Sequence, residues 1–458
     1  MEELYILNED CAISVVNLLP SNKRMTFSLT SKILSKTFFM RDNVCPNSKL
    51  DLKKLIKFKH VYNLTLLAYN KFKNVELFYN LTHLSIGKKN NLECISGLKN
   101  LYSLNIHSNK LTNINTLSNI TSVELQYESI QMISSLISLK KLCVLRKSYR
   151  SRNEPSIQYN LNYHTNLQTL ILPYQIPDYN IFSDIRLLKN LEYISCDNVD
   201  VFASGYSLQK LTYLKLNLHK LRKYDTSSYG NLLSMKNRHD KLLYNAPCVQ
   251  NLKLKYFVSD KIDCLQKLTH LSLKFINLTF SLTILQNLKS LKLTQLERNH
   301  ECNIENTTLE KLYIWRSYNG QPCSFVGNFE LLTHLTIENV VNKIDFSCML
   351  NLKELKIKSK GKKFINIDLL TQLTYLYLGQ NTIKIKHMNR LTNLLILDIG
   401  SHKIESFDCF VKLTELHISA NNIDLYNASN LRNLRKIYFS RKNPKMVNIG
   451  CHDLKIYM

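Results

Sequence analysis

LTHLSL at residues 268–273 is nearly identical to LTHLSI at 81–86 and to LTHLTI at 332–337. All three are instances of a wider pattern, L-x-x-L-x-L, which recurs about eighteen times, mostly 19 to 21 residues apart. Its copies begin at residues 61, 81, 101, 120, 139, 167, 191, 211, 249, 268, 288, 309, 332, 352, 373, 394, 413 and 434, with a partial copy, CHDLKI, at 451–456. Recurrence at a fixed period near 20 residues indicates a solenoid.

The spacing of the leucines within one copy predicts its local structure. The last two apolar positions alternate with an outward one, which is the periodicity of a β-strand. Such a strand buries its leucines only against the next repeat, so the copies must stack side by side. A short period leaves little chain for the other side, where we expect 3₁₀ or extended segments. The sequence therefore predicts an α/β solenoid with a parallel sheet on its concave side.

The pattern resembles the leucine-rich repeat family over about residues 50–458. The resemblance implies a curved solenoid, a horseshoe, whose concave sheet presents the residues between the leucines. The family pattern continues with an asparagine three positions after the third leucine, where its amide satisfies backbone groups of the turn. Asn109, Asn381 and Asn421 occupy that position, and most other copies depart from it.

Two intervals between copies are longer than the others. They separate the copies at 139 and 167, by 28 residues, and those at 211 and 249, by 38 residues. The longer interval holds, within 218–248, either a degenerate repeat near LLSMKN (232–237), which we prefer, or a long basic loop. NHEC at 299–302 places His300 near Cys302, and we interpret it as a turn between repeats.

The first fifty residues lack the repeat and are expected to be helical. Ile13, Val16 and Leu19 follow helical spacing, and Pro20 ends that helix. A second helix that carries Leu29 follows. The chain is therefore expected to begin with a small helical domain at 1–45.

The segment 7–39 resembles an F-box, by the residues Leu7, Glu9, Ile13, Val16, Leu19, Pro20, Phe27, Leu29, Ser31 and Lys32. The resemblance implies a substrate-recognition subunit of a cullin–Skp ubiquitin ligase, in which the solenoid holds the substrate. An Skp-type adaptor would dock on Leu7, Ile13, Val16, Leu19, Pro20 and Leu29. The alternative is a plain helical cap that shields the first repeat. The chain would then be a scaffold or regulatory binding module with no ubiquitin link.

The chain is strongly basic, with 61 Lys and Arg against 35 Asp and Glu, a formal net charge of +26. This charge suits an acidic protein, nucleic acid or anionic lipid. The many Asn, Ile, Tyr and Lys residues also fit an AT-rich codon bias, which spreads lysine without any ligand. The N-terminus MEELYILNEDC shows no signal pattern and no apolar run of about twenty residues occurs, so we expect an intracellular protein, cytoplasmic or nuclear, with no membrane contact.

Nothing in the sequence indicates catalysis. Phosphate-binding, dinucleotide-binding and zinc-protease motifs are absent, and the twelve cysteines show no paired spacing, which is typical of reduced thiols. We therefore expect no enzyme and no cofactor or metal. The repeated histidines, His83, His270 and His334, are several strands apart at about 4.8 Å per strand, too far to share a metal ion. We expect them to be solvated outward residues.

The outward positions from about 213 to 358 are rich in lysine and aromatic residues. They comprise Lys215, Lys253, Lys255, Tyr256, Lys274, Phe275, Lys292, Tyr313, Trp315, Arg316, Lys356 and Lys358, and Tyr377 continues the same column. Trp, Tyr and Arg are frequent anchors of protein interfaces. One hypothesis is that this surface binds an acidic protein or peptide, and the other is that codon bias alone fills exposed strand positions. Nucleic acid fits less well, because basic residues also occupy the convex turns. The sequence leaves the oligomeric state open.

Overall fold

The computed structural model describes the repeat region in part. The described residues are 62–66, 75–87, 92, 94–107, 111, 114–145, 159–172, 187–196, 208–217, 244, 246–255, 261–274, 282, 284–296, 302–304, 308–316, 323–325, 329–339, 344–358, 364–379, 388–400, 406–418, 430–439 and 454–457. The predicted helical domain, with the adaptor-binding residues Leu7, Ile13, Val16, Leu19, Pro20 and Leu29, lies outside them. So do Asn109, Asn381 and Asn421.

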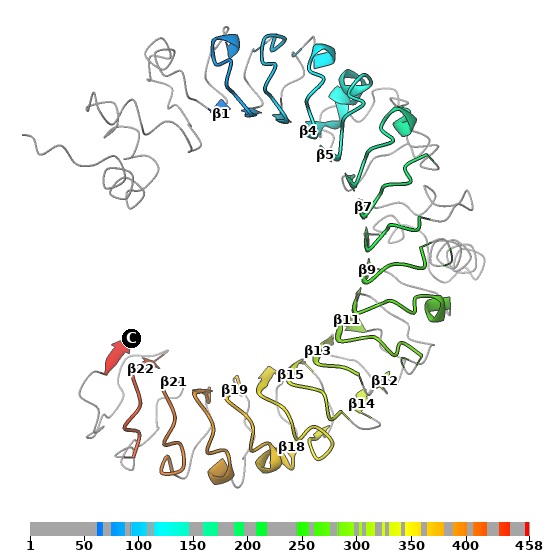
Figure 1. Ribbon diagram of the computed structural model, residues 1–458. Helices are drawn as coiled ribbons and strands as arrows, with labels where there is room; N and C mark the ends of the chain where they lie inside the picture. Colours follow the sequence, from blue (N-terminus) through cyan, green and yellow to red (C-terminus); the bar gives the residue numbers. More distant parts are fainter. Residues whose placement is uncertain are drawn as a thin grey trace, which may run out of the picture. The chain divides into compact units, whose positions relative to one another are not determined.

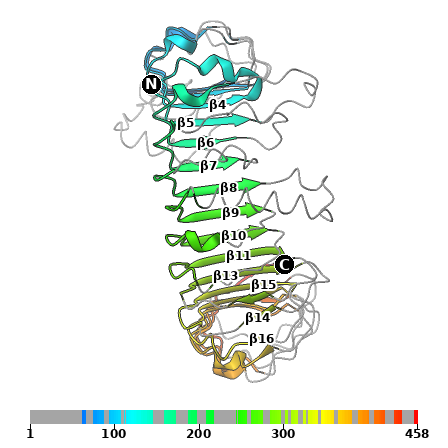
Figure 2. The same ribbon diagram turned by 90° about the vertical axis from the view of Figure 1, so that its right-hand side faces the viewer.

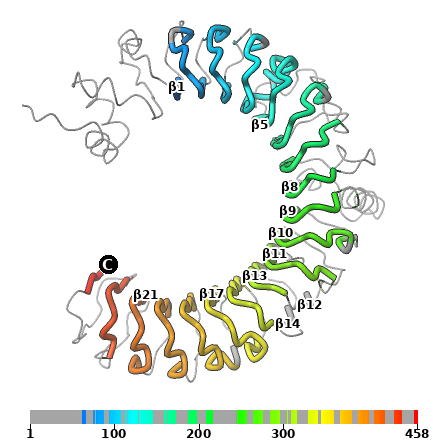
Figure 3. The backbone as a smooth tube through the Cα atoms, viewed as in Figure 1, coloured from blue at the N-terminus to red at the C-terminus, as the bar shows by residue number. Residues whose placement is uncertain are grey.

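The chain forms two compact units, Met1–Tyr206 and Ser207–Met458. Among its described residues the first unit contains a parallel sheet in which each strand pairs with the next along the chain (Figures 1 and 3). Its strands are β1 (Asn63–Leu66), β2 (His83–Ile86), β3 (Ser103–Ile106), β4 (Ser122–Gln126), β5 (Lys141–Leu145), β6 (Thr169–Ile171) and β7 (Tyr193–Cys196).

The second unit contains a parallel sheet built in the same way. Figure 2 shows its strands β8, β9, β10, β11, β13 and β15 side by side, as successive rungs. The described strands of this sheet are β8 (Tyr213–Asn217), β9 (Asn251–Lys255), β10 (His270–Lys274), β11 (Ser290–Leu296), β13 (Lys311–Arg316), β15 (His334–Glu338), β17 (Glu354–Lys358), β19 (Tyr375–Tyr377), β20 (Ile396–Asp398), β21 (Glu415–Ile418), β22 (Lys436–Phe439) and β23 (Lys455–Tyr457).

The leucine rows of the repeat fill the core of both units. Each predicted copy from residue 61 to residue 434 carries a strand that begins two residues after its first apolar position. In β10, Leu271 is 2% exposed and Leu273 is fully buried. Their Cα partners are leucines on β9 and β11, so each apolar position is stacked between its equivalents. The predicted fold, a parallel-strand solenoid of the leucine-rich repeat type, is confirmed.

In the described part of the chain, the side of the repeats opposite the sheets carries short segments, as predicted. It carries the 3₁₀ helices η2 (Val75–Leu77), η3 (Ile114–Thr116), η4 (Tyr127–Ile133), η6 (Leu161–Tyr163), η10 (Lys261–Cys264), η11 (Ile367–Leu369) and η12 (Met388–Arg390).

Two small parallel sheets were not expected from the sequence. One pairs β12 (Cys302–Ile304) with β14 (Cys323–Phe325), and the other pairs β16 (Ile344–Asp345) with β18 (Phe364–Ile365). The interpretation of NHEC as a turn is therefore wrong at Cys302, which begins strand β12.

Neither long interval adds a strand to the sheets. β5 pairs directly with β6, and β8 pairs with β9 along its whole length, with Leu214 opposite Leu252. Because β9 occupies the hydrogen-bonding edge of β8, a further repeat cannot lie between them. The predicted degenerate repeat near 232–237 lies outside the described part of the chain, as do residues 218–243, and no strand of it lies between β8 and β9.

An asparagine directly before the first leucine links one repeat to the previous one. Its side-chain amide donates to a backbone carbonyl of the preceding repeat, at 2.9 Å from Asn100 Nδ2 to the Tyr79 oxygen. The same bond is made by Asn119, Asn166, Asn190, Asn287, Asn351, Asn393 and Asn433. The sequence prediction placed the structural asparagine elsewhere, and this row was missed. Its signal was the pair Asn-Leu, which recurs at the start of eight of the eighteen copies.

The threonine at the second position of the hexapeptide also donates a hydrogen bond to a backbone carbonyl of the preceding repeat. Thr269 Oγ1 donates to the Gln250 carbonyl oxygen of the preceding repeat, at 3.1 Å. A hydroxyl has one proton, so it accepts from the adjacent His270 Nδ1, 2.8 Å away. Thr82 with His83 and Thr333 with His334 repeat this arrangement. The hexapeptide therefore recurs for its threonine as well as its leucines, because the threonine bonds to the preceding repeat and the histidine bonds to that threonine.

Candidate functional site

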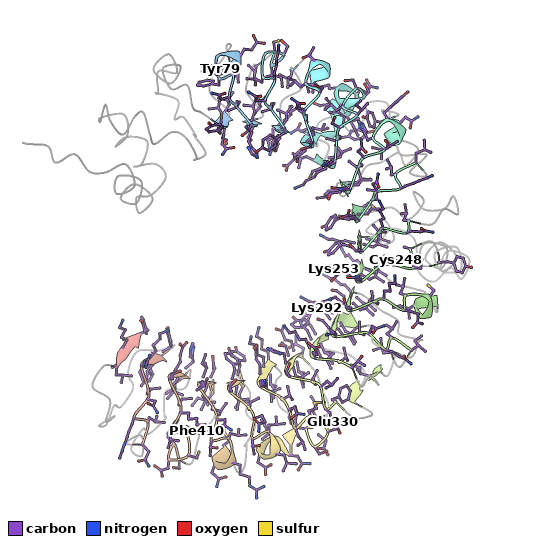
Figure 4. All side chains as sticks on the ribbon, viewed as in Figure 1. Tyr79, Cys248, Lys253, Lys292, Glu330 and Phe410 are labelled. Atoms are coloured by element: carbon purple, nitrogen blue, oxygen red, sulfur yellow. The ribbon has the colours of Figure 1, made fainter. Side chains whose placement is uncertain are left out.

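Among the described side chains, the outward face of β8 to β11 carries lysines and no acidic residue. The outward positions with described side chains are Tyr213, Lys215, Asn251, Lys253, Lys255, His270, Ser272, Lys274, Ser290, Lys292 and Thr294. We call its five lysines, Lys215, Lys253, Lys255, Lys274 and Lys292, the lysine surface. Figure 4 shows Lys253 and Lys292 on the strand side of this unit. The sheet register thus gathers on four adjacent strands residues that are up to 77 positions apart, from Lys215 to Lys292.

Several of these lysines lie directly opposite one another. The Cα partner of Lys215 is Lys253, and that of Lys255 is Lys274. Like charges at the spacing of adjacent strands, about 4.8 Å, repel each other. Among the described residues, no carboxylate forms an ion pair with Lys215, Lys253 or Lys292. This surface therefore favours an anion from outside.

Tyrosines on flanking strands orient two of the lysines. Lys253 Nζ lies 5.4 Å from the centroid of the Tyr213 ring, and Lys292 Nζ lies 4.5 Å from that of Tyr313. A cation over an aromatic face gains about 0.5–1 kcal/mol at an exposed site. Because the ammonium groups are already held, less side-chain entropy is lost when a partner binds.

The neighbouring face of β13, β15 and β17 has a different charge pattern, which we call the mixed surface (Tyr313, Trp315, Glu338, Glu354, Lys356 and Lys358). Lys358 Nζ lies 2.9 Å from Glu338 Oε1, and Lys356 pairs with Glu354. Two predicted binding lysines are thus neutralised within the sheet. The sequence analysis missed both glutamates, although Glu338 stands in the same outward column as Lys358. Glu354 lies in the column beside that of Lys356, two residues earlier on the same strand.

Trp315 and Tyr313 lie where the two surfaces meet. Trp315 is half-buried on β13, between its Cα partners Thr294 on β11 and Glu338 on β15. The Tyr313 hydroxyl donates to Glu338, and burial and then this carboxylate raise the pKa of Tyr313. The hydrogen bond from Lys358 to Glu338 raises the pKa of Lys358. This network fixes the surroundings of the single tryptophan of the chain.

The remaining predicted binding residues are placed in part. Tyr256 and Phe275 lie outside the described residues, and Arg316 ends β13 without a described side chain. Tyr377 lies outward on β19, and its ring centroid is 5.8 Å from Lys358 Nζ. The structure thus brings the predicted lysines and aromatics onto one sheet face, but divides them by charge.

A second titratable cluster lies on β20 to β22. His417 Nε2 lies 2.7 Å from Glu415 Oε1, and His417 Nδ1 lies 3.9 Å from Asp398 Oδ2. The imidazole is stacked on the Tyr438 ring at 4.3 Å. Its groups already satisfy one another, since Glu415 also binds Lys436 and Asp398 accepts from the Gly400 amide.

Other kinds of site were sought in the described part of the chain. It contains no group of three His, Cys, Asp or Glu side chains that could hold a metal ion. Its free cysteines are Cys94, Cys143, Cys196, Cys248, Cys264, Cys348 and Cys409, of which Cys196 alone is buried. None of its helices has the length and hydrophobicity to cross a bilayer.

The geometry defines a leucine-rich repeat solenoid with a lysine-bearing sheet face. No protein-family model matches the chain, and no curated protein matches it. Among solved structures, an internalin (inlF) from Listeria monocytogenes is 16% identical, with a TM-score of 0.30, over 83% of this chain and 86% of that one. The TLR13–ssRNA13 complex is 15% identical, with a TM-score of 0.38, over 87% and 78%. The functional domain of InlJ from Listeria monocytogenes is 14% identical, with a TM-score of 0.33, over 86% and 72%. Likenesses this low carry no information on what this chain binds.

Proposed function

We propose that the chain is a non-enzymatic recognition protein that binds an acidic protein segment on the lysine surface. The observation that carries this proposal is the set of five lysines on four adjacent strands, with no acidic residue among the described outward side chains. Surfaces of one charge sign speed the encounter with partners of the opposite sign. The flanking Tyr313 and Trp315 supply residue types that often anchor interfaces.

The experiment uses a fluorescently labelled poly-glutamate peptide and the full chain, with affinity measured by anisotropy. Lys292→Ala and Trp315→Ala are expected to weaken binding several-fold, by about 1 kcal/mol each. Lys99→Ala, an exposed turn lysine of the first unit, is the matched control. Absent binding, or an equal loss in Lys99→Ala, would contradict the proposal.

The finer proposal is that the bound protein is a substrate of a cullin–Skp ubiquitin ligase, inside the cell. It rests on the F-box resemblance of residues 7–39 alone, and the runner-up is a scaffold or regulatory module without a ligase link. The full chain should capture an Skp-type adaptor, and Leu19→Asp, which places a charge on the predicted docking helix, should abolish capture. Failure of the unaltered chain to capture the adaptor would leave the runner-up.

A further inference from the structure

The charge pattern along the second unit changes abruptly at β13. On β8 to β11, Lys215, Lys253 and Lys292 form no ion pair with a described carboxylate, whereas Glu338 on β15 and Glu354 on β17 pair with Lys358 and Lys356. A polyanionic ligand that extends past β13 would approach these two carboxylates. Its favourable contacts therefore end at the boundary between the lysine surface and the mixed surface.

An aromatic pair marks that boundary. Tyr313 and Trp315 are both half-buried on β13, and Tyr313 is the Cα partner of Lys292. The hydroxyl of Tyr313 is held by Glu338, while its ring contacts the Lys292 ammonium. Rigid aromatic side chains bury apolar area at a low cost in entropy. The end of the lysine surface therefore suits an uncharged aromatic or aliphatic group, not another carboxylate.

We infer that the ligand is a short linear segment with a block of acidic residues followed or preceded by one apolar anchor. The acidic block lies across β8 to β11 and the anchor lies against Tyr313 and Trp315. Five strands spaced by about 4.8 Å span about 19 Å, which an extended chain covers in about six residues. This inference rests on the proposed function. It adds the length of the recognised segment and the position of its apolar anchor at one end of the acidic block.

The placement of the paired lysines favours acidic residues that follow one another directly. Lys215 opposite Lys253 and Lys255 opposite Lys274 form two positions at which positive charges face each other. Consecutive acidic residues reduce both repulsions at once, whereas an isolated carboxylate reduces only one. A contiguous block is therefore favoured over dispersed charges.

The test compares terminally blocked peptides of one composition: EEEEGF, its reverse order FGEEEE, and EEFGEE. Calorimetry with the full chain should show that one of the two block peptides binds about tenfold more tightly than EEFGEE, the scale of one interface anchor. Emission from Trp315, the only tryptophan, should change with that block peptide and not with its phenylalanine-to-alanine analogue. Trp315→Ala should make block and central-anchor peptides equal.

The possible outcomes separate the two proposals. If all three peptides bind equally, or if Trp315→Ala preserves the difference, the inferred order is wrong while the proposed function stands. If no peptide binds, the proposed function fails and the inference fails with it. A thymidine hexanucleotide that binds more tightly than every peptide would overturn both in favour of single-stranded nucleic acid.

Discussion

The outward faces of the two units are built on the same repeat but carry different side chains. On β1 to β5 of the first unit they are Asn63, Thr65, His83, Ser85, Ser103, Asn105, Ser122, Glu124, Gln126, Lys141, Cys143 and Leu145. Small polar residues dominate, with one lysine and one glutamate. On β8 to β11 of the second unit, five of eleven described outward side chains are lysines and none is acidic.

This difference bears on the codon-bias interpretation. The first unit has exposed lysines on its turns, such as Lys99, Lys140 and Lys189, so its lysine content is not generally low. A bias in codon use acts on all outward positions alike, and it gives no reason for lysines to be scarce on one sheet face and concentrated on another. The concentration on β8 to β11 is therefore the stronger argument for a binding surface.

The largest expected effect comes from reversing the charge of the lysine surface. Lys215→Glu, Lys253→Glu and Lys292→Glu together should weaken poly-glutamate binding at least about a hundredfold, since the loss of three attractions of about 1 kcal/mol each gives that factor and the introduced repulsions add to it. The control reverses Lys99, Lys140 and Lys189 to Glu and changes the net charge equally. Affinities that fall equally in the two triple variants would show that only net charge matters.

A gain of function on the first unit would sharpen the comparison. Thr65→Lys, Ser85→Lys and Asn105→Lys occupy mutually paired positions of β1, β2 and β3, as Lys215 and Lys253 do on β8 and β9. Added to the charge-reversed second unit, these three lysines should restore about tenfold of the lost affinity, by calorimetry. If nothing is restored, the tyrosines and Trp315 contribute more than the charges.

The units should also differ in their response to acid. His164, fully buried in the first unit, takes the core position that Leu136 and Leu188 take in flanking repeats. Its Nδ1 donates to the Leu136 carbonyl at 3.0 Å, and its Nε2 contacts the Tyr159 hydroxyl. Burial lowers the pKa of His164, only partly offset by that carbonyl. Among described residues, the one buried polar side chain of the second unit is that of Thr294.

Because the folded pKa is depressed, the unfolded chain binds the proton more readily, and stability falls as pH drops below about 6.5. Between pH 7.5 and 5.5 the free energy of unfolding of the first unit should fall by up to about 1.4 kcal/mol. Thermal unfolding followed by limited proteolysis would assign the loss to one unit. His164→Leu should remove most of the dependence on pH, since only His83 of the first unit, whose pKa is also lowered by partial burial, would still contribute among the described histidines. A dependence that persists in full in this variant would contradict the role of His164.

The smallest effect should follow from moving the charge boundary. Glu338→Gln frees Lys358 from its carboxylate while retaining a side chain that can accept from Tyr313. The lysine surface would then continue onto β17, and a longer peptide, EEEEEEEE, should bind about threefold more tightly by anisotropy. An unchanged affinity would mean that Lys358 does not reach the ligand.

The fold was predictable because each repeat contains the apolar spacing that is typical of a β-strand. One hexapeptide such as LTHLSL contains the buried leucines, and its recurrence supplies the stacking that a single copy lacks. The hydrogen bonds of Asn100 and Thr82 to the preceding repeat were not predicted, since leucine periodicity says nothing about which polar group meets a carbonyl. Apolar spacing alone also could not show that β9 pairs directly with β8 across the long interval.

The alignment of the lysines of the candidate site across the strands was predictable from the sequence. Which lysines form ion pairs with glutamates was not predicted. Lys215, Lys253 and Lys292 align as the repeat register requires. Glu338 stands opposite Lys358 in one column, so this ion pair was readable from the register and was missed. The pair of Glu354 with Lys356 joins two columns of one strand, which a reading of single columns omits.

Lysine footprinting tests the central claim most directly, because it uses the unaltered chain and contains its own control. Lysines are acetylated with and without saturating poly-glutamate peptide, and each modified position is quantified by mass spectrometry. We predict that Lys215, Lys253 and Lys292 become protected while Lys99, Lys140 and Lys189 keep their reactivity. Equal protection of both sets, or of neither, would contradict a binding site on the lysine surface.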